Sequence, residues 1–304
     1  MNPASVSDSA REFSPGLSVR GIAPPLRLRD FKLIAFDMDS TLINIECVDE
    51  IADAAGRKAE VAAITEAAMR GEITDYKESL RQRVGMLQGV REEHLAQVYR
   101  ARLRLNPGAA ELVLACKAAG LKVLLVSGGF TYFSDRLRDR LALDFARSNK
   151  LEIVGGQLTG RILPQSWGDI CDGAMKRETV LRTCSLIGCE PSQAIAMGDG
   201  ANDLEMMGAV GLSVAYRAKP RVREQAKVAI DMGGWIGCWS CSARRSGDRG
   251  HRLRRAQRRP ASLSPRTPNA PLHPHPPLGH RLEFNVTYAP LARRPLTEGL
   301  CDTA

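Results

Sequence analysis

Two carboxylates two positions apart, Asp37 and Asp39, directly follow the short apolar run 33–36. In an extended chain residues i and i+2 point to the same side, so both side chains are expected to face one cleft. Neighbouring carboxylates repel each other, which raises the pKa of one of them or demands a cation. An oxygen-ligated cation such as Mg2+ would relieve this repulsion and could also hold a phosphate group. Taken alone, the pattern is also open to a second interpretation, a solvated loop that is acidic by chance.

Two further apolar runs end in polar groups. The run 121–126 ends in Ser127 and two glycines, whose hydroxyl and backbone N–H groups could bind phosphate oxygens. The run 194–197 ends in Gly-Asp-Gly-Ala-Asn-Asp, residues 198–203, which offers two carboxylates and an amide at a tight turn. Such a set suits a hard metal ion, although a plain turn would also use these residue types.

Ordered elements must bring these polar ends together. We predict strands and helices in alternation, with strands over 33–36, 121–126, 194–197 and 210–215, helices over 109–119, 133–141 and 177–186 and from 204, and a hairpin over 151–162. This alternation is typical of the α/β class, here a Rossmann-like parallel sheet with helices on both faces. In such sheets ligands bind at the carboxyl ends of the strands, where the three polar groups lie.

A long helical stretch interrupts this alternation after the first strand. Helical periodicity over 46–55, 57–70, 75–87 and 92–103 predicts an inserted cap spanning 46–106. The core is then expected to comprise 30–45 and 107–234. Residues 1–29 are rich in Ser, Pro and Arg and lack periodicity, so we expect a flexible lead-in.

Residues 235–304 differ in composition from the rest of the chain. This segment holds 12 Arg, no Lys and only four acidic residues, whereas residues 1–234 hold 31 basic and 30 acidic residues. The net charge of +9 therefore arises almost entirely in the last 70 residues, and a nucleic-acid surface on the core is not expected. We expect a disordered tail, and an out-of-frame reading of GC-rich DNA is our preferred hypothesis for it.

The remaining composition excludes several protein classes. No apolar run is long enough to span a bilayer and no signal-peptide core is present, so a cytoplasmic protein is expected. We expect Cys47, Cys116, Cys171, Cys184 and Cys189 to be free. The CxxC spacing at 238–241 has no second pair, and we attribute it to chance. The sequence leaves a homodimer open.

The ordered combination of DxDST, SGG, a lysine and GDGxND is far more specific than its parts. With these motifs the sequence resembles the haloacid dehalogenase superfamily of aspartate-dependent phosphatases, and within it the phosphoserine phosphatases. The resemblance continues through Ile-Glu-Cys-Val-Asp-Glu, Ala-Met-Arg-Gly-Glu and Ser-Leu-Arg-Gln-Arg-Val in the cap, and covers roughly residues 30–232. It implies Mg2+-dependent hydrolysis of O-phospho-L-serine, the last step of serine biosynthesis, through an aspartyl-phosphate.

The resemblance also implies a role for individual residues. Asp37 would be the nucleophile and Asp39 the general acid and then base. Mg2+ would be held by Asp37, the backbone carbonyl of Asp39 and Asp199, with Asp203 in support. The residues expected to bind substrate are Ser127, Gly128, Lys176 and Asn202 for the phosphoryl group, Glu46 for the amine, Arg83 for the carboxylate, and Met69 and Tyr76 for the pocket wall.

The sequence departs from the family pattern in three places. Asp75 makes the cap segment one residue longer than expected, which weakens the assignment of Tyr76. The family's amino-terminal domain is replaced by the short lead-in, and its usual carboxyl-terminal core segment gives way to the tail after Gly234. Three alternatives stay open: a phosphatase or phosphotransferase for another small ester such as phosphohomoserine, a receiver-like regulatory protein, and nucleic-acid binding through the tail.

Overall fold

The structure is a computed structural model that describes residues 10–22 and 26–232. The tail expected over 235–304, including its CxxC pair, lies outside the described residues. Within the described part of the chain, the strands form one sheet in the order β1-β2-β9-β8-β7-β3-β4-β5-β6. Their bounds are β1 (Arg11–Ser14), β2 (Leu17–Val19), β3 (Leu33–Phe36), β4 (Lys122–Phe130), β5 (Phe145–Val154), β6 (Gln157–Leu163), β7 (Ala194–Gly198), β8 (Leu212–Tyr216) and β9 (Val228–Ile230).

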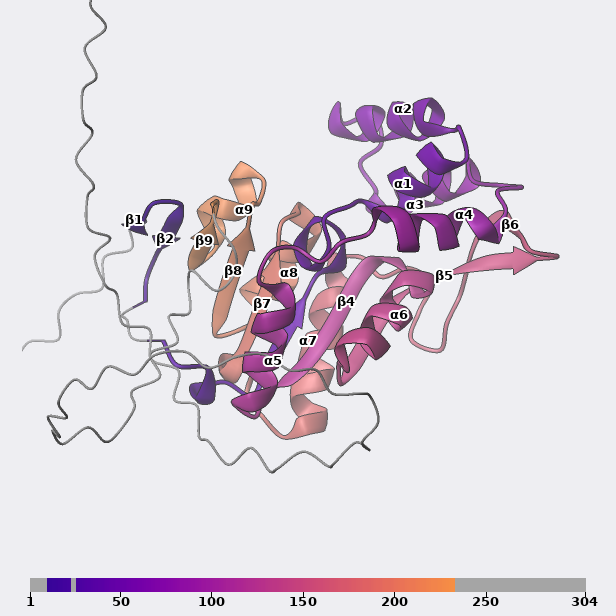
Figure 1. Ribbon diagram of the computed structural model, residues 1–304. Helices are drawn as coiled ribbons and strands as arrows, with labels where there is room; N and C mark the ends of the chain where they lie inside the picture. The colour runs from indigo at the N-terminus through magenta and orange to yellow at the C-terminus, as the bar shows by residue number, and fades with distance from the viewer. Residues whose placement is uncertain (1–9, 23–25, 233–304) are drawn as a thin grey trace, which may run out of the picture.

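The centre of the sheet is parallel and its two margins are antiparallel. Strands β9, β8, β7, β3, β4 and β5 run parallel, whereas β1 and β2 at one edge and β6 at the other pair antiparallel. The predicted parallel sheet is thus confirmed for the centre, and the complete sheet is mixed. Because β3 lies between β7 and β4 and runs parallel to both, the carboxyl ends of these three strands lie side by side (Figure 1). The three predicted polar groups are therefore neighbours.

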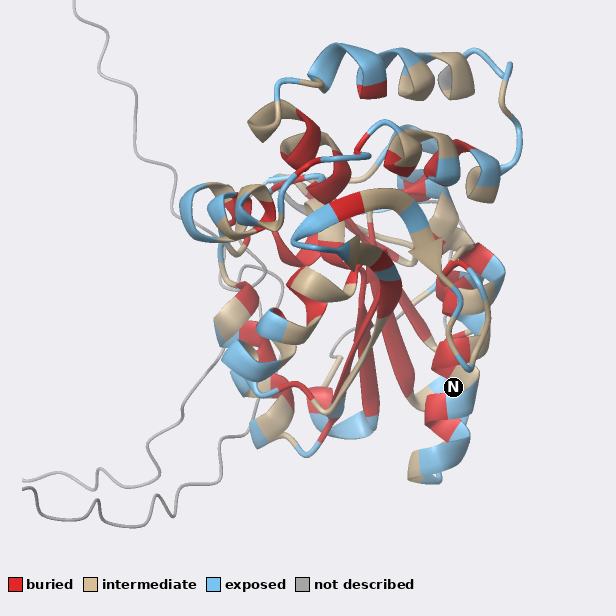
Figure 2. Ribbon diagram, turned by 90° about the vertical axis from the view of Figure 1, so that its right-hand side faces the viewer, coloured by how far each residue is buried: buried red, intermediate tan, exposed pale blue. Residues whose placement is uncertain are grey.

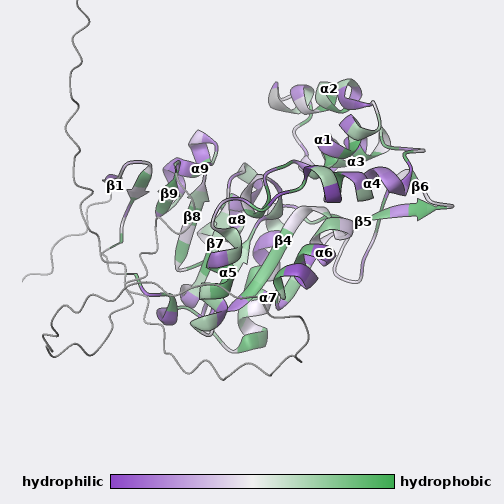
Figure 3. Ribbon diagram, in the orientation of Figure 1, coloured by the Kyte–Doolittle hydropathy of each residue, from purple (hydrophilic) through white to green (hydrophobic). Residues whose placement is uncertain are grey.

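Alternating side chains of the central strands pack on opposite faces of the sheet. In β3, Leu33 and Ala35 belong to one apolar cluster, and Ile34 and Phe36 belong to the other. The first cluster is completed by α7 (Gly173–Ile187), α8 (Leu204–Gly208) and α9 (Pro220–Gln225), and the second by α5 (Ala109–Ala118) and α6 (Thr131–Leu141). Strands covered on both faces read as continuous apolar runs, which explains the pattern 33–36. Buried strands between half-exposed helices are visible in Figure 2, and the apolar strand centres in Figure 3.

The cap lies over the carboxyl ends of the strands (Figure 1). It comprises α1 (Cys47–Ala54), α2 (Lys58–Met69), α3 (Tyr76–Gly85), α4 (Glu92–Gln97) and a π-helical turn at Val98–Arg102. Each predicted cap helix is present within a few residues of its expected bounds. The hairpin of β5 and β6 reaches under the cap, where the Gly89 amide donates to the Leu158 carbonyl (2.7 Å).

The lead-in differs from expectation, because residues within 1–29 carry regular structure. Strand β2 pairs antiparallel with β9, and β1 pairs with β2 through a turn at Gly16, whose φ is +77°. Strands of three or four residues show too little alternation to be recognised from sequence. Strand β9 was missed for the same reason, and the six-residue α9 is too short to show helical periodicity. No helix in the described ranges has the length and apolar character of a membrane span.

Candidate active site

Asp37 stands at the carboxyl end of β3, and its backbone N–H donates to the Met197 carbonyl of β7 (2.9 Å). Its carboxylate is nearly buried, with 5% of the residue exposed. Burial and the neighbouring carboxylates of Asp203, Asp199 and Asp39 raise the pKa of Asp37, while the Lys176 ammonium opposes the rise. An ionised Asp37 therefore depends on the positive charge held beside it.

Lys176 supplies that charge from the first turn of α7. Its side chain is fully buried, and its Nζ donates to Asp37 Oδ1 (2.6 Å) and to Asp203 Oδ1 (2.7 Å). Burial lowers the pKa of Lys176, but the charges of Asp203 and Asp37 outweigh burial and raise it well above its ordinary value. Lys176 thus stays an ammonium that joins the first and third polar strand ends.

The turn after β7 fixes the other two acidic residues. Asp203 Oδ2 accepts hydrogen bonds from the backbone N–H of Gly200 (3.0 Å) and of Asp199 (3.2 Å). A Cβ at Gly198 would lie 2.4 Å from the Asp203 carboxylate, so the turn requires glycine there. Asp199 Oδ1 in turn accepts from the Thr41 hydroxyl (3.1 Å). Thr41 lies within the DxDST motif, but sequence reasoning gave it no role.

Three carboxylates in this arrangement fit a divalent cation. Oxygens of Asp37, Asp199 and Asp203 all lie within 4.8 Å of one another. Burial, followed by the charges of Asp203 and Glu46, raises the pKa of Asp199 to about 7. Carboxylate oxygens are the ligands that Mg2+ prefers. The Asp39 carboxylate stands outside this group, in keeping with a role other than side-chain ligation.

Asp39 lies in the π-helical turn Met38–Leu42 that follows the nucleophile position. Burial, then the charge of Glu46, raises the pKa of Asp39 to about 8, although hydrogen bonds from Cys47 oppose the rise. Its Oδ1 is buried and has no hydrogen-bond partner within the described residues. A Cβ at Gly129 would lie 3.0 Å from Asp39 Oδ2, so the SGG segment passes close to this carboxyl group.

The turn that carries Asp39 is held by a residue that sequence reasoning missed. Ser40 has φ +56°, which is uncommon for a residue with a side chain. The buried Asn106 amide donates to the carbonyls of Thr41 (2.7 Å), Ile43 (2.9 Å) and Ser40 (3.3 Å). Asn106 lies at the junction of cap and core, about sixty positions away in the chain, so no local pattern could have indicated it.

The SGG segment forms the last residues of β4 and not a separate loop. Ser127 is buried, and its Oγ accepts from the Gly129 N–H (2.8 Å). The buried Asn149 holds this segment in place, because its Nδ2 donates to the Gly128 carbonyl (2.7 Å) and its Oδ1 accepts from the Cys171 N–H (2.8 Å). Asn149 was also missed, since a single Asn in a strand carries no sequence signal.

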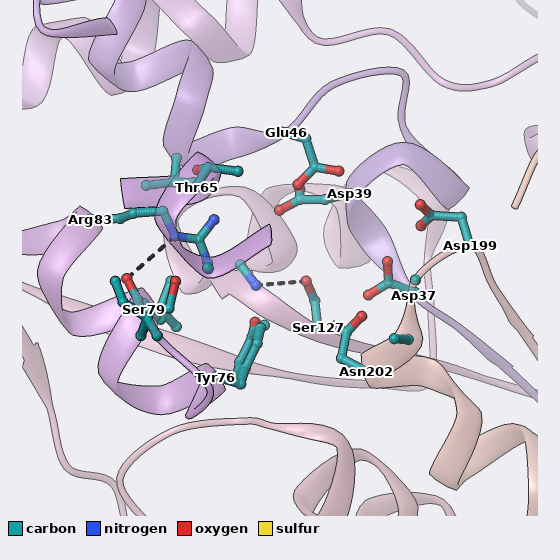
Figure 4. Close-up of a pocket in the computed structure, with 18 of the residues that line it drawn as sticks. Asp37, Asp39, Glu46, Thr65, Tyr76, Ser79, Arg83, Ser127, Asp199 and Asn202 are labelled. Carbon is teal, nitrogen blue, oxygen red and sulfur yellow. Dashed lines mark hydrogen bonds between the residues drawn. The ribbon is translucent and has the colours of Figure 1, made fainter. Parts of the chain in front are cut away.

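Residues of the cap close the other side of a cavity of about 360 Å³. Figure 4 shows Tyr76 and Arg83 on the opposite side of this cavity from Asp37, and Glu46 beside Asp39. Glu46 accepts from the Ser40 hydroxyl (2.6 Å), and Arg83 Nε donates to the Ser79 carbonyl (3.4 Å).

The extra residue in the cap segment does not displace Tyr76 from the cavity. Asp75 is the N-cap of α3, and its Oδ1 accepts a hydrogen bond from the Lys77 N–H (2.8 Å). Tyr76 is therefore the first residue of the helix, and it lines the cavity. Met69 ends α2, and its side chain lies outside the described part of the structure.

The structure thus brings together most of the residues predicted from the sequence. The predicted residues that line the cavity are Asp37, Asp39, Glu46, Tyr76, Arg83, Ser127, Gly128, Asp199 and Asn202. Lys176 and Asp203 lie buried behind Asp37, to which Lys176 is bonded. The cavity is also lined by Thr65, Ser79 and Lys219, which sequence reasoning did not single out.

A comparison with protein families finds a match to the haloacid dehalogenase-like hydrolases over residues 31–211. The chain is 73% identical over 223 residues to a phosphoserine phosphatase of Polaromonas sp. strain JS666, and the match covers 73% of this chain and 94% of that protein. It is 71% identical over 222 residues to the phosphoserine phosphatase of Albidiferax ferrireducens, with 94% of that protein covered.

Solved structures give the same result. A probable phosphoserine phosphatase from Vibrio cholerae, unliganded, superposes with a TM-score of 0.62 at 47% identity, over 69% of this chain and 64% of that one. A phospho-aspartyl intermediate analogue of phosphoserine phosphatase superposes with a TM-score of 0.62 at 36% identity, over 68% and 96% of the two chains. With its acidic strand ends, buried lysine and inserted cap, the chain belongs to the haloacid dehalogenase-like hydrolases and, within them, to the phosphoserine phosphatase family.

Proposed function

We propose that this chain hydrolyses O-phospho-L-serine to L-serine and phosphate, with Asp37 as the nucleophile. The observation that carries the proposal is the buried Lys176 ammonium, which contacts Asp203 and also Asp37, the residue at the floor of a cavity roofed by Glu46, Tyr76 and Arg83. The core end of this cavity suits a phosphoryl group, and the cap end suits the ammonium and carboxylate of an amino acid. The names of the relatives support the same substrate.

The first step transfers the phosphoryl group to the protein. An Asp37 carboxylate oxygen attacks phosphorus, and the bond between phosphorus and the serine oxygen breaks. Asp39 gives its proton to that leaving oxygen, and its pKa of about 8 keeps the proton available at neutral pH. The product of this step is an aspartyl-phosphate on Asp37 and free serine.

The second step returns the protein to its starting state. The Asp39 carboxylate, now ionised, takes a proton from a water molecule, and that water attacks phosphorus. The bond between phosphorus and Asp37 breaks, which releases inorganic phosphate. One residue can serve as acid and then as base because each step leaves it in the protonation state that the next step needs.

Fixed groups of the site contribute to charge neutralisation. Lys176 balances the nucleophile, while the N–H groups of the SGG segment, the Ser127 hydroxyl and the Asn202 amide bind phosphoryl oxygens. Asp37, the Asp39 carbonyl, Asp199 and Asp203 would hold Mg2+. Bound there, Mg2+ would stabilise the negative charge that builds up on the phosphoryl oxygens.

The cap binds the amino-acid part of the substrate. The planar guanidinium of Arg83 can bind both oxygens of a carboxylate, and Glu46 carries the charge that an ammonium requires. Both side chains line the same cavity as Asp37, so a small substrate can contact all three. Met69 and Tyr76 are proposed to complete the pocket wall.

The decisive experiment measures phosphate release from O-phospho-L-serine with Mg2+, for wild type and Asp37→Asn. We expect turnover by the wild type and none by the variant, with a 32P-labelled wild-type intermediate that is stable in acid and labile to hydroxylamine. Turnover that survives Asp37→Asn would refute the mechanism. Relative kcat/KM values for phosphoserine, phosphohomoserine and phosphoethanolamine then test the substrate assignment, since phosphoethanolamine lacks the carboxylate that Arg83 would bind.

The proposed setting is the final step of serine biosynthesis in the cytoplasm, with a small molecule as the functional partner. A homodimer is proposed as the assembly, and light scattering after size-exclusion chromatography would test it. A monomeric mass for active enzyme would overturn that assignment without affecting the proposed reaction.

A further inference from the structure

An ion-pair cluster joins the cap helix α3 to the core loop that precedes α7. Lys77 Nζ lies 3.2 Å from Asp169 Oδ1 and 3.4 Å from Asp172 Oδ2, and Arg81 Nη2 lies 2.6 Å from Asp169 Oδ2. Lys77 and Arg81 are four positions apart, so they project from the same face of α3. None of these four residues belongs to the site described above.

The core side of the cluster is rigidly connected to the catalytic lysine. Asp172 is the N-cap of α7: its Oδ1 accepts from the Met175 N–H (2.9 Å), and its carbonyl accepts from the Lys176 N–H (2.8 Å). Asp169 Oδ1 accepts from the Ile170 N–H (2.8 Å) in addition to Lys77. The cap is therefore paired with the turn of helix that presents Lys176 to Asp37.

The cap side of the cluster carries residues of the cavity wall. Tyr76 directly precedes Lys77, and its hydroxyl lies so close to the SGG segment that a Cβ at Gly128 would be 2.0 Å from it. Arg83 follows Arg81 on the same helix and lines the same cavity. A displacement of α3 would therefore move Tyr76 and Arg83 away from the phosphate end of the cavity.

The two ends of α3 are held by different kinds of contact. Near its carboxyl end, Gly160 of β6 packs against Gly85, since a Cβ at Gly160 would lie 3.1 Å from the Gly85 carbonyl. Just beyond the helix, the Leu158 N–H donates to the Val90 carbonyl (2.8 Å). The amino-terminal half of α3 meets the core through the contact of Tyr76 with the SGG segment and through ion pairs whose side chains are a third to a half exposed. Ion pairs of this kind are individually weak and are screened by salt, so they are the part of this contact that charge and salt can change.

Lys77 and Asp169 are both charged near neutral pH. Partial burial lowers the pKa of Lys77, but its contacts with Asp169 and Asp172 outweigh burial and raise that pKa above its ordinary value. Burial likewise raises the pKa of Asp169, but the Ile170 N–H, Lys77 and Arg81 outweigh it and lower that pKa. Attraction between α3 and the loop thus persists over the pH range in which a phosphatase would work.

We propose that Lys77, Arg81, Asp169 and Asp172 form an electrostatic clamp that holds the amino-terminal half of α3 over the phosphate end of the cavity. These are positioning residues, because they act through Tyr76, which opens the clamped half of α3. The effect on kinetics rests on the proposed function, whereas the effect on α3 itself does not. Weakening the clamp lowers the fraction of molecules with α3 in place, and apparent substrate affinity falls by that fraction.

The test neutralises the clamp without disturbing the backbone. Lys77→Gln, Arg81→Gln and Asp169→Asn remove charge, and Asn at 169 keeps an oxygen for the Ile170 N–H. We expect each to raise KM for phosphoserine about two- to fivefold, and the Lys77→Gln/Arg81→Gln pair about tenfold, with kcat unchanged or higher. Lys77→Arg and Arg81→Lys should retain wild-type KM. Arg182→Gln is the matched control, because it breaks an exposed ion pair with Glu178 on α7 that does not reach the cap.

A second readout is independent of turnover. Hydrogen exchange of the α3 amides, residues 76–85, should accelerate about threefold or more in the double variant, and in the wild type on raising salt from 0.05 to 1 M. The double variant should show little further response to salt, and Arg182→Gln should match the wild type. Unchanged α3 exchange in the double variant would overturn the clamp, as would an unchanged KM or a fall in kcat alone in active enzyme. If the wild type does not hydrolyse phosphoserine, the proposed function fails and α3 exchange still decides the clamp.

Discussion

The close approach of Tyr76 to Gly128 allows a substitution to be paired with its own rescue. The backbone of Gly128 is not in the left-handed region, so Gly128→Ala introduces no torsional strain. The added Cβ would nevertheless lie 2.0 Å from Tyr76 Oη, a distance that carbon and oxygen atoms cannot share. Either α3 moves or the SGG segment does, and both form the cavity.

The size of the effect follows from the same contacts. Overpacking of this kind costs about 1–3 kcal/mol, so Gly128→Ala should lower the free energy of unfolding by that amount and raise KM. Tyr76→Phe removes the clashing oxygen and leaves the ring carbon Cζ at 3.2 Å and the Cys171 carbonyl at 3.4 Å as the nearest atoms. These contacts are tight but can be relieved by small shifts. The double variant Gly128→Ala/Tyr76→Phe should therefore recover most of the lost stability.

Urea unfolding of the two single variants and the double variant gives the coupling energy directly. Gly208→Ala is the control, because a Cβ there meets no atom within 4 Å, and it should be neutral or stabilising by about 0.4–1 kcal/mol. A Gly128→Ala protein as stable as the wild type would refute the reasoning. So would a double variant no more stable than Gly128→Ala, because the clash would then not involve the Tyr76 hydroxyl.

Three other predictions concern the charged floor of the cavity. Lys176→Met leaves two buried carboxylates without their cation, and should abolish turnover and cost about 3–5 kcal/mol by urea unfolding; retention of full stability would contradict the ion-pair arrangement. Mg2+ at a hundred times its Kd should stabilise the wild type by about 2.7 kcal/mol over EDTA in thermal unfolding, and Asp199→Asn much less; equal gains would place the ion elsewhere. In EDTA, the contribution of Asp199 to stability, taken as wild type minus Asp199→Asn, should decline as pH rises from 3.8 to about 7. Asp199 has a raised folded-state pKa, so its contribution is present at low pH and is lost as the pH passes that value; a difference that is flat across this window would argue against a buried carboxylate at this position.

Much of the fold could be predicted from local patterns. The runs 33–36, 121–126 and 194–197 are apolar without interruption because both faces of a central parallel strand are covered by helices. Each run ends in polar residues, so the order of the three polar ends predicted one site at one sheet edge. The margins of the sheet escaped prediction, since β1, β2 and β9 are three or four residues long and are stabilised by pairing with one another.

The sequence by itself determined which residue types stand at the strand ends, because the apolar composition of the strands and the polarity of their ends are local properties of the chain. It also determined the family, through the order of its motifs. Tertiary structure decided which groups meet: Lys176 reaches Asp37 across 139 positions, and Asn106 and Asn149 hold the two segments that face each other in the site. Hydrogen bonds between segments distant in sequence leave no periodic trace, so the residues that hold the site in shape become visible only when the chain is folded.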